Sequence, residues 1–229
     1  MKYTTVLFDA DDTLLDFKKS ERTAISAVLS ELGLPTDEHT IKVYSEINDS
    51  LWKLLEVGGI KKEVLKVERF RRLCEHFGFE VSPDRMAERY MDALSEQSYL
   101  VDTAESVCRS IYNAKIRMYI ITNGIKTIQS RRLAATPIAQ LFDGVFISEE
   151  IGYEKPRREF FDRATSMIED FDISKTLVVG DSLTSDIKGG IDYGIDTCWY
   201  NPKQKARPDG VNMTYEITEL CQVLDVLEI

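Results

Sequence analysis

Short apolar runs that stop abruptly at polar residues recur along the chain, and they constrain the fold more than any other feature. The first run, Tyr3–Phe8, ends in an acidic stretch that begins at Asp9. Later runs are separated by segments with helical periodicity; they are Met118–Ile121, Val145–Ile147, Leu177–Val179 and Thr197–Tyr200. Strands that alternate with helices predict a parallel sheet with helices on both faces.

The segment between the first run and the later ones has a different character. From about residue 18 to residue 97, apolar residues recur at helical spacing, and glycine or proline interrupts the pattern at 33–35, 58–59, 78 and 82–83. This pattern predicts about four helices. We therefore expect an α/β fold with a Rossmann-like parallel-sheet core, formed by residues 1–16 and 100–229, and an inserted all-helical domain at residues 17–99.

Composition excludes several classes of function. The formal net charge of −10, without a compensating basic run, disfavours binding to nucleic acid or to an acidic membrane surface. No apolar run approaches membrane-spanning length, and the N-terminal sequence reaches acidic residues too early for a signal peptide. The four cysteines are far apart, which favours buried thiols over a disulfide or zinc framework. We expect a cytoplasmic monomer or homodimer that acts on a small molecule.

Polar groups of one consistent kind follow the predicted strands. In a parallel sheet, ligands bind beyond the carboxyl ends of the strands, near the point where the strand order reverses. Carboxylates, hydroxyls, an amide and an ammonium group are expected there, in the segments Asp9–Thr13, Thr122–Gly124, Gly152–Pro156 and Gly180–Asp186. These are the groups that phosphate chemistry needs, because the negative charge of the phosphate must be screened while a nucleophile is aligned.

The carboxylates can be assigned separate roles. Asp9 and Asp181, on different strands, can each give an oxygen to one Mg²⁺, an ion that favours oxygen ligands. Asp9 is the expected nucleophile, forming an aspartyl-phosphate. Asp11, two residues later on a segment expected to be extended, would project to the same side and act as general acid and then base. The sequence thus predicts a Mg²⁺-dependent hydrolase of phosphate monoesters.

The other strand ends supply groups for the phosphate. Thr122 would offer its hydroxyl, and Asn123 its amide at the opening of a helix, where anions are favoured. Lys155 would add a permanent positive charge. Asp186, one helical turn beyond Asp181, would hold metal-bound water or Lys155 in place.

Each motif alone has an ordinary structural explanation. Asp-x-Asp-x-Thr can be a turn or a helix cap, and Lys155-Pro156 a solvated loop. A calcium-binding EF-hand loop at Asp9 is excluded because Leu14 stands where its glycine belongs and Ser20 where its bidentate Glu belongs. The order of all four motifs, each at an expected strand end, favours a catalytic site.

The motifs FDADDTL, ITNG, GYEKP with Phe160, and GDSLTSDIKGG resemble the four motifs of the haloacid dehalogenase-like hydrolase superfamily, in the same order. The helical segment is similar to that superfamily's helical cap of the first type. Asp12, the Leu51-Trp52 pair and the stretch DIKGGIDYGIDTCWYN most resemble the noncanonical pyrimidine 5′-nucleotidase branch, although most of the superfamily has glycine at the position of Asp12. The implied substrate is a nucleoside 5′-monophosphate.

The resemblance also implies a full set of site residues. They are nucleophile Asp9, acid/base Asp11, phosphate groups Thr122, Asn123 and Lys155, and metal groups Asp9, Asp11 (through its backbone carbonyl), Asp181 and Asp186.

Other functions stay open at this level. A phosphatase of sugar phosphates or other small metabolites would use the same chemistry. Relatives that are phosphomutases usually have an aliphatic residue where Thr13 stands, and a phosphonatase would need a lysine from the helical domain. A non-catalytic phosphate-sensing regulator would also gather Asp, Thr and Lys around Mg²⁺, but sensing does not need an acid/base such as Asp11.

Overall fold

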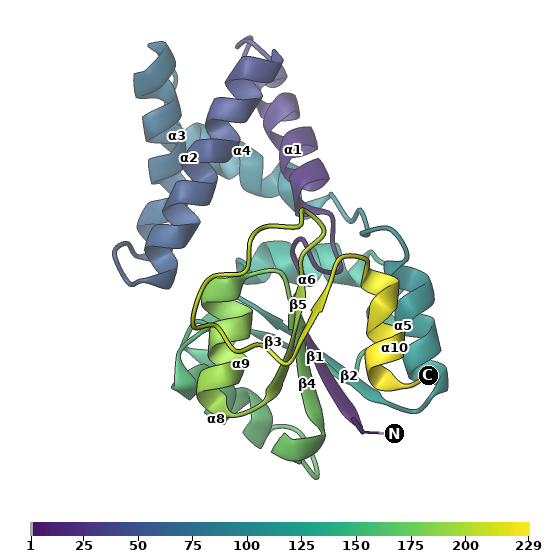
Figure 1. Ribbon diagram of the computed structural model, residues 1–229. Helices are drawn as coiled ribbons and strands as arrows, with labels where there is room; N and C mark the ends of the chain where they lie inside the picture. Colours follow the sequence, from purple (N-terminus) through teal and green to yellow (C-terminus); the bar gives the residue numbers. More distant parts are fainter. Residues whose placement is uncertain (1) are drawn as a thin grey trace. The chain divides into compact units, whose positions relative to one another are not determined.

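A computed structural model describes residues 2–229 of the chain, which form two compact units (Figure 1). One unit contains the chain up to Asp16 together with Tyr99–Ile229, and the other is Phe17–Ser98. The chain therefore passes between the units twice, so that the second unit is an insertion in the first. Among the described residues, no helix combines the length and apolar character that crossing a membrane requires.

The first unit is built on a six-stranded sheet in the order β3-β2-β1-β4-β5-β6, in which every pair is parallel. The strands are β1 (Thr5–Phe8), β2 (Arg117–Thr122), β3 (Gly144–Ile147), β4 (Thr176–Gly180), β5 (Asp196–Tyr200) and β6 (Tyr215–Ile217). This confirms the predicted α/β class. Five strands match predicted runs, although β1 begins at Thr5 instead of Tyr3. The sixth, β6, was not predicted.

Helices cover both faces of this sheet (Figure 1). They are α5 (Ala104–Asn113), α6 (Lys126–Ala134), α7 (Ser148–Ile151), α8 (Arg158–Ser166), α9 (Lys188–Tyr193) and α10 (Val223–Leu227). Side chains alternate between faces along each strand. Val6 and Phe8 of β1 pack in the cluster that includes α5 and α10, whereas Leu7 packs in the cluster that includes α8. Two buried layers thus hold the strands in a fixed register.

Strand order places the carboxyl ends of β1 and β4 side by side. The chain runs from β1 outward to β2 and β3, and then returns to place β4 on the other side of β1. The pairing aligns Phe8 with Val179, and the backbone N–H of Asp9 donates to the carbonyl of Val179 at 2.9 Å. Residues that directly follow β1 and β4 therefore meet at the topological switch point, where ligands bind in sheets of this kind.

The second unit consists of four helices, α1 (Phe17–Glu31), α2 (Glu38–Glu56), α3 (Lys62–Phe77) and α4 (Pro83–Ser95). Their ends carry ordinary signals: the Asp37 side chain caps α2, Ser82 caps α4 just before Pro83, and Gly78 ends α3 with φ of 69°. The rings of Tyr44, Phe70 and Tyr90 pack together inside, with centroids 5.4 Å apart. The prediction of about four helices is confirmed.

The cysteines are free thiols. Cys74, Cys108 and Cys198 are buried as predicted, whereas Cys221 is partly exposed. Leu51 is fully buried in the helical unit, and Trp52 packs against the same apolar cluster.

Candidate active site

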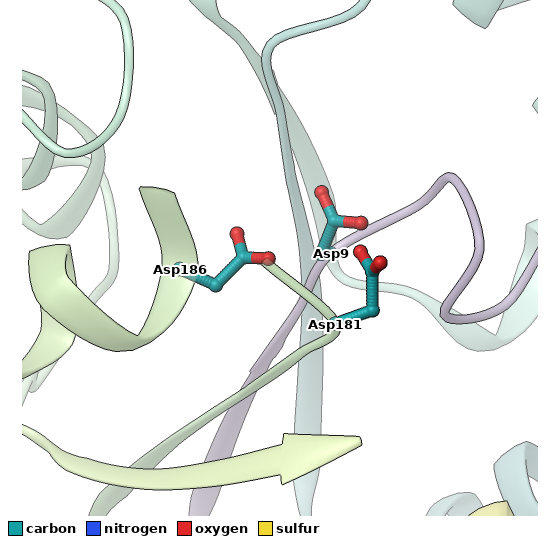
Figure 2. Close-up of side chains that lie close together, drawn as sticks. All are labelled: Asp9, Asp181 and Asp186. Atoms are coloured by element: carbon teal, nitrogen blue, oxygen red, sulfur yellow. The ribbon is translucent and has the colours of Figure 1, made fainter. Parts of the chain in front are cut away.

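Three carboxyl groups converge at the carboxyl ends of β1 and β4. Asp9 directly follows β1, Asp181 directly follows β4, and Asp186 lies in the π-helical segment Leu183–Ile187. One oxygen from each lies within 4.8 Å of the others. Figure 2 shows the three side chains turned toward a common space. The sequence prediction that residues from separate strand ends meet here agrees with this geometry.

Asp186 is held in place by its own loop. Its Oδ2 accepts a hydrogen bond from the backbone N–H of Ser182 at 3.1 Å, and the side chain is fully buried. A Cβ at Gly180 would lie 2.3 Å from that same oxygen. Glycine is therefore required at the end of β4, because any side chain there would displace the Asp186 carboxylate.

Lys155 connects two of the carboxylates. Its Nζ lies 2.7 Å from Oδ1 of Asp9 and 2.6 Å from Oδ1 of Asp186, and it donates to the carbonyl of Ile121 at 2.8 Å. An ammonium group has three N–H donors, and these three contacts occupy them. The side chain is only 1% exposed. The positive charge is thus fixed beside Asp9 as the sequence suggested, and the predicted contact of Asp186 with Lys155 is present.

Burial and the mutual repulsion of the carboxylates dominate the electrostatics of this cluster of three aspartates and Lys155. Burial, followed by the charge of Asp186, raises the pKa of Asp9 from 3.8 to about 8, although Lys155 opposes the shift. Burial and the charges of Asp9 and Asp186 likewise raise the pKa of Asp181 well above its usual range. Burial acts to lower the pKa of Lys155, but the charges of Asp186 and Asp9 outweigh burial and raise it.

These carboxylates fit a divalent cation. One ammonium can neutralise only one of three carboxylates, and burial together with the neighbouring carboxylates raises the pKa values of Asp9 and Asp181. Carboxylate oxygens are the ligands that Mg²⁺ prefers. The backbone of Asp181 is itself anchored, because the indole N–H of Trp199 donates to its carbonyl at 3.0 Å. The backbone carbonyl of Asp11 stays a predicted ligand.

Thr122 and Asn123 lie at the end of β2, as predicted, but not at a helix N-terminus. Helix α6 begins at Lys126, so the expectation that Asn123 opens the helix is wrong. The Asn123 side chain instead brackets the backbone of Lys155: its Nδ2 donates to the Lys155 carbonyl, and its Oδ1 accepts from the Lys155 N–H, both at 2.9 Å. Asn123 therefore positions Lys155 with its side chain, and the predicted contact with phosphate would fall to its backbone N–H.

The chain turns at residues 12–14, shortly after the strand β1. The backbone N–H groups of Leu14 and Leu15 both donate to the carbonyl of Ala10, and Asp12 adopts a left-handed conformation with φ of 59°. Aspartate tolerates this region better than most residues, and glycine tolerates it best. Asp11 itself lies just before this turn, in an isolated β-bridge with Leu15.

Two residues that the sequence analysis did not single out contact Asp11. Arg132 Nη1 lies 2.5 Å from Oδ1 of Asp11, and Gln129 Nε2 lies 2.8 Å from Oδ2. Both side chains come from α6. Their spacing of three residues puts them on one side of the helix, but nothing local in the sequence distinguishes such a pair from an ordinary polar stripe.

The chain matches the haloacid dehalogenase-like hydrolase family over residues 3–194. It is 34% identical to YfnB of Bacillus subtilis, described as a HAD-hydrolase, over 100% of this chain and 97% of the relative. It is 39% identical to the pyrimidine 5′-nucleotidase PynA of Streptococcus pneumoniae, over 100% and 96%, and 33% identical to the pyrimidine 5′-nucleotidase YjjG of Escherichia coli, over 99% of each.

Solved structures agree with these matches. The crystal structure of B. subtilis YfnB bound to magnesium covers 100% of both chains with a TM-score of 0.95 at 34% identity. A 2-haloacid dehalogenase from Pseudomonas syringae shares the fold, with a TM-score of 0.68 at 24% identity, covering 99% of this chain and 98% of that one. Matches of this extent leave one assignment: the chain is an enzyme that belongs to the haloacid dehalogenase-like hydrolase family.

Proposed function

We propose that this enzyme is a Mg²⁺-dependent phosphatase that attacks phosphate monoesters with Asp9. The proposal rests mainly on the surroundings of Asp9, which directly follows the central strand β1. The Lys155 ammonium lies 2.7 Å away, and Asp181 and Asp186 are near enough to share a cation with Asp9. A carboxylate in this setting can approach an anionic phosphate, because positive charge offsets the repulsion between them.

In the first half of the reaction, an oxygen of Asp9 forms a bond to phosphorus while the ester P–O bond breaks. The carboxylic acid of Asp11 gives its proton to the departing alcohol oxygen. In the second half, the Asp11 carboxylate takes a proton from water as the water oxygen attacks phosphorus, and the bond between phosphorus and the Asp9 oxygen breaks. Inorganic phosphate then leaves, and both carboxyl groups are restored.

The other residues act on charge and position. Asp9, Asp181 and Asp186 would hold Mg²⁺, which when bound supplies positive charge against the phosphate oxygens and the carboxylates. Lys155 keeps a second positive charge beside Asp9. The Thr122 hydroxyl and the backbone N–H of Asn123 are the proposed donors to the phosphate oxygens.

We propose a pyrimidine nucleoside 5′-monophosphate as the substrate. Two relatives that align over nearly their whole length carry the name pyrimidine 5′-nucleotidase, at 39% and 33% identity. The four-helix unit, Phe17–Ser98, would act as the cap that selects the alcohol part of the ester. The proposal keeps the enzyme in the cytoplasm as a monomer or homodimer, on the sequence grounds given above.

A phosphatase of sugar phosphates is the second candidate. A ribulose-1,5-bisphosphate 5-phosphatase of Halopiger xanaduensis is 28% identical over 89% of this chain, and a glyceraldehyde 3-phosphate phosphatase of Pyrococcus furiosus is 27% identical over 97%. These identities are lower than those of the two nucleotidases, which favours the nucleotide.

The test is phosphate release from a panel of nucleoside monophosphates, sugar phosphates and 4-nitrophenyl phosphate, with Mg²⁺ and with EDTA. The proposal predicts Mg²⁺-dependent release that is fastest with UMP and dTMP. Asp9→Asn, purified in the same way, controls for contaminating host phosphatases. Faster release from a sugar phosphate would move the substrate to the second candidate. No release from any ester by the folded protein would overturn the phosphatase itself and favour a sensing role.

A further inference from the structure

Helix α6 contacts both the proposed acid/base and the proposed phosphate donor through one side chain. Gln129 Nε2 donates to Oδ2 of Asp11 at 2.8 Å and to Oγ1 of Thr122 at 2.9 Å. Arg132 Nη1 lies 2.5 Å from Oδ1 of Asp11. Both α6 side chains are buried, at 1% and 0% exposure. Asp11 thus has each of its carboxyl oxygens held by a buried donor.

The arrangement is fixed internally. Arg132 Nη1 also donates to Oε1 of Gln129 at 3.0 Å, so the amide oxygen of Gln129 faces the guanidinium and its NH₂ group faces Asp11 and Thr122. The two N–H donors of the amide then match its two acceptors. A flipped amide would place its NH₂ against the guanidinium and its oxygen against the Asp11 carboxylate, and would lose both of those hydrogen bonds.

The same contact orients the Thr122 hydroxyl. Its Oγ1 accepts from Gln129 Nε2 and from the backbone N–H of Gly124, at 2.9 and 3.0 Å. A hydroxyl oxygen has two acceptor positions and one proton. With both acceptor positions occupied, Thr122 can contribute only as a donor, which is the role a phosphate oxygen requires.

Gly124 leaves the space that Gln129 occupies. A Cβ at position 124 would lie 2.5 Å from Cγ and 2.6 Å from Nε2 of Gln129. Contacts this short force the amide to move. The loop after β2 and the helix α6 are therefore matched to each other at this point.

From this geometry we propose that Gln129 and Arg132 are positioning residues, which hold the Asp11 carboxyl and the Thr122 hydroxyl in a fixed mutual arrangement for transfer of the phosphoryl group. This inference rests on the proposed function. Asp11 lies just before the turn at residues 12–14 and its side chain is 28% exposed, so its buried partners Gln129 and Arg132 are what hold its two oxygens in place. Misplacement of a reacting group by about 1 Å can cost roughly 100-fold in rate.

The test compares phosphate esters whose leaving groups differ in how strongly their departure depends on protonation. Gln129→Met removes the amide and keeps a similar volume. For kcat/KM, we expect a loss of about 30- to 100-fold with UMP, whose leaving alkoxide needs protonation, and a loss of only about 3-fold with 4-nitrophenyl phosphate. A series of aryl phosphates should show a steeper dependence of kcat/KM on leaving-group basicity than wild type. The small loss shared by all esters reports the Thr122 contact. A loss with UMP no larger than the loss with 4-nitrophenyl phosphate would show that Gln129 does not position the acid, and it would overturn the proposal.

A double-mutant cycle gives the second readout. Arg132 is proposed to act through Asp11. In the Asp11→Asn background, Arg132→Met should therefore lower kcat/KM for 4-nitrophenyl phosphate by less than about 2-fold. In the wild-type background, the same substitution should lower kcat/KM by a larger factor. Arg132→Lys should restore part of the loss because it keeps the charge. Full additivity of the two substitutions would contradict the proposal.

Gly124→Ala is a second variant in case Gln129→Met does not fold. It displaces the Gln129 side chain without removing a polar group. It should reproduce the selective loss with UMP. If the wild-type enzyme releases phosphate but the variants lose activity equally on all esters, the positioning role is contradicted and the proposed function is not. A folded wild-type protein that releases phosphate from no ester would overturn the proposed function and this inference together.

Discussion

The ammonium nitrogen of Lys155 lies 2.7 Å from Oδ1 of Asp9, although the two residues are 146 positions apart in the sequence. The parallel sheet produces this pairing, because Asp9 follows the central strand and Asn123 at the end of the neighbouring strand holds the Lys155 backbone. The contact is buried, so the positive charge of Lys155 is fixed beside Asp9.

Replacing Lys155 by methionine should abolish phosphate release and destabilise the metal-free protein by about 3–5 kcal/mol at pH 7, because it leaves buried carboxylates without their partner. Urea unfolding in EDTA measures the loss of stability. Lys188→Met is the matched control: it removes an exposed ion pair with Asp192 and should change stability by less than about 1 kcal/mol. Equal effects of the two substitutions would contradict the account of Lys155.

Substituting Gly180 by alanine should weaken Mg²⁺ binding and lower kcat, although it replaces no ionisable group. The added Cβ would lie 2.3 Å from Oδ2 of Asp186, and the cost of this overpacking is about 1–3 kcal/mol of stability. Gly144→Ala, at which the nearest contact is 3.2 Å to the Tyr119 ring, serves as a control in the same sheet. Titration of Mg²⁺ by calorimetry checks the prediction, and an unchanged affinity in Gly180→Ala would refute it.

The metal-free protein should lose stability as the pH rises toward 8. Burial and the charge of Asp186 raise the pKa of Asp9 to about 8 in the folded state, above its ordinary 3.8. The folded state therefore binds a proton that the unfolded chain releases near pH 4, and the stability linked to it disappears as the pH rises through the folded value. The raised pKa of Asp181 acts in the same direction.

This pH effect is measured by urea unfolding between pH 5.5 and 8.5, where each proton contributes up to about 1.4 kcal/mol per pH unit. Asp9→Asn should flatten the profile in EDTA. Saturating Mg²⁺ should stabilise the wild-type protein more at pH 8 than at pH 6. A metal-free stability that increases over this range would contradict the electrostatic account.

The sequence predicted the architecture well because its signals are local. Short apolar runs separated by helical periodicity are enough to identify β1 to β5 and the four helices of the second unit. β6 was missed because Tyr215–Ile217 is only three residues long and its middle residue, Glu216, is exposed. The helix α6 was expected at Asn123 but begins at Lys126, since an N-terminal boundary is the least certain feature of a periodic pattern.

The candidate site was predicted only as far as its motifs extend. Asp9, Asp181 and Asp186 could be grouped because they follow strands of one parallel sheet. Gln129 and Arg132 could not be assigned to the site from the sequence. Their partner Asp11 lies 118 and 121 positions away, and both are ordinary residues for a helix. Only packing of α6 against the turn after β1 reveals them.

Asp11→Asn should slow both halves of the proposed reaction while leaving binding intact. The variant loses the proton donor and acceptor but keeps the side-chain volume, so we expect substrate and Mg²⁺ affinities within about 3-fold of wild type and kcat lower by about 100- to 10,000-fold. Equilibrium binding of UMP and steady-state kinetics measure the two quantities. A variant with near-normal kcat would remove Asp11 from the mechanism.

The most direct test of the central claim is to trap the covalent intermediate on Asp9. UMP labelled with ³²P is mixed with Mg²⁺ and excess enzyme and quenched in acid within milliseconds, and the labelled peptide is located by mass spectrometry. The account predicts a phosphorylated Asp9 that hydroxylamine removes and that Asp9→Asn does not form. Phosphate release by wild type without any label on Asp9, or with the label on another residue, would contradict it.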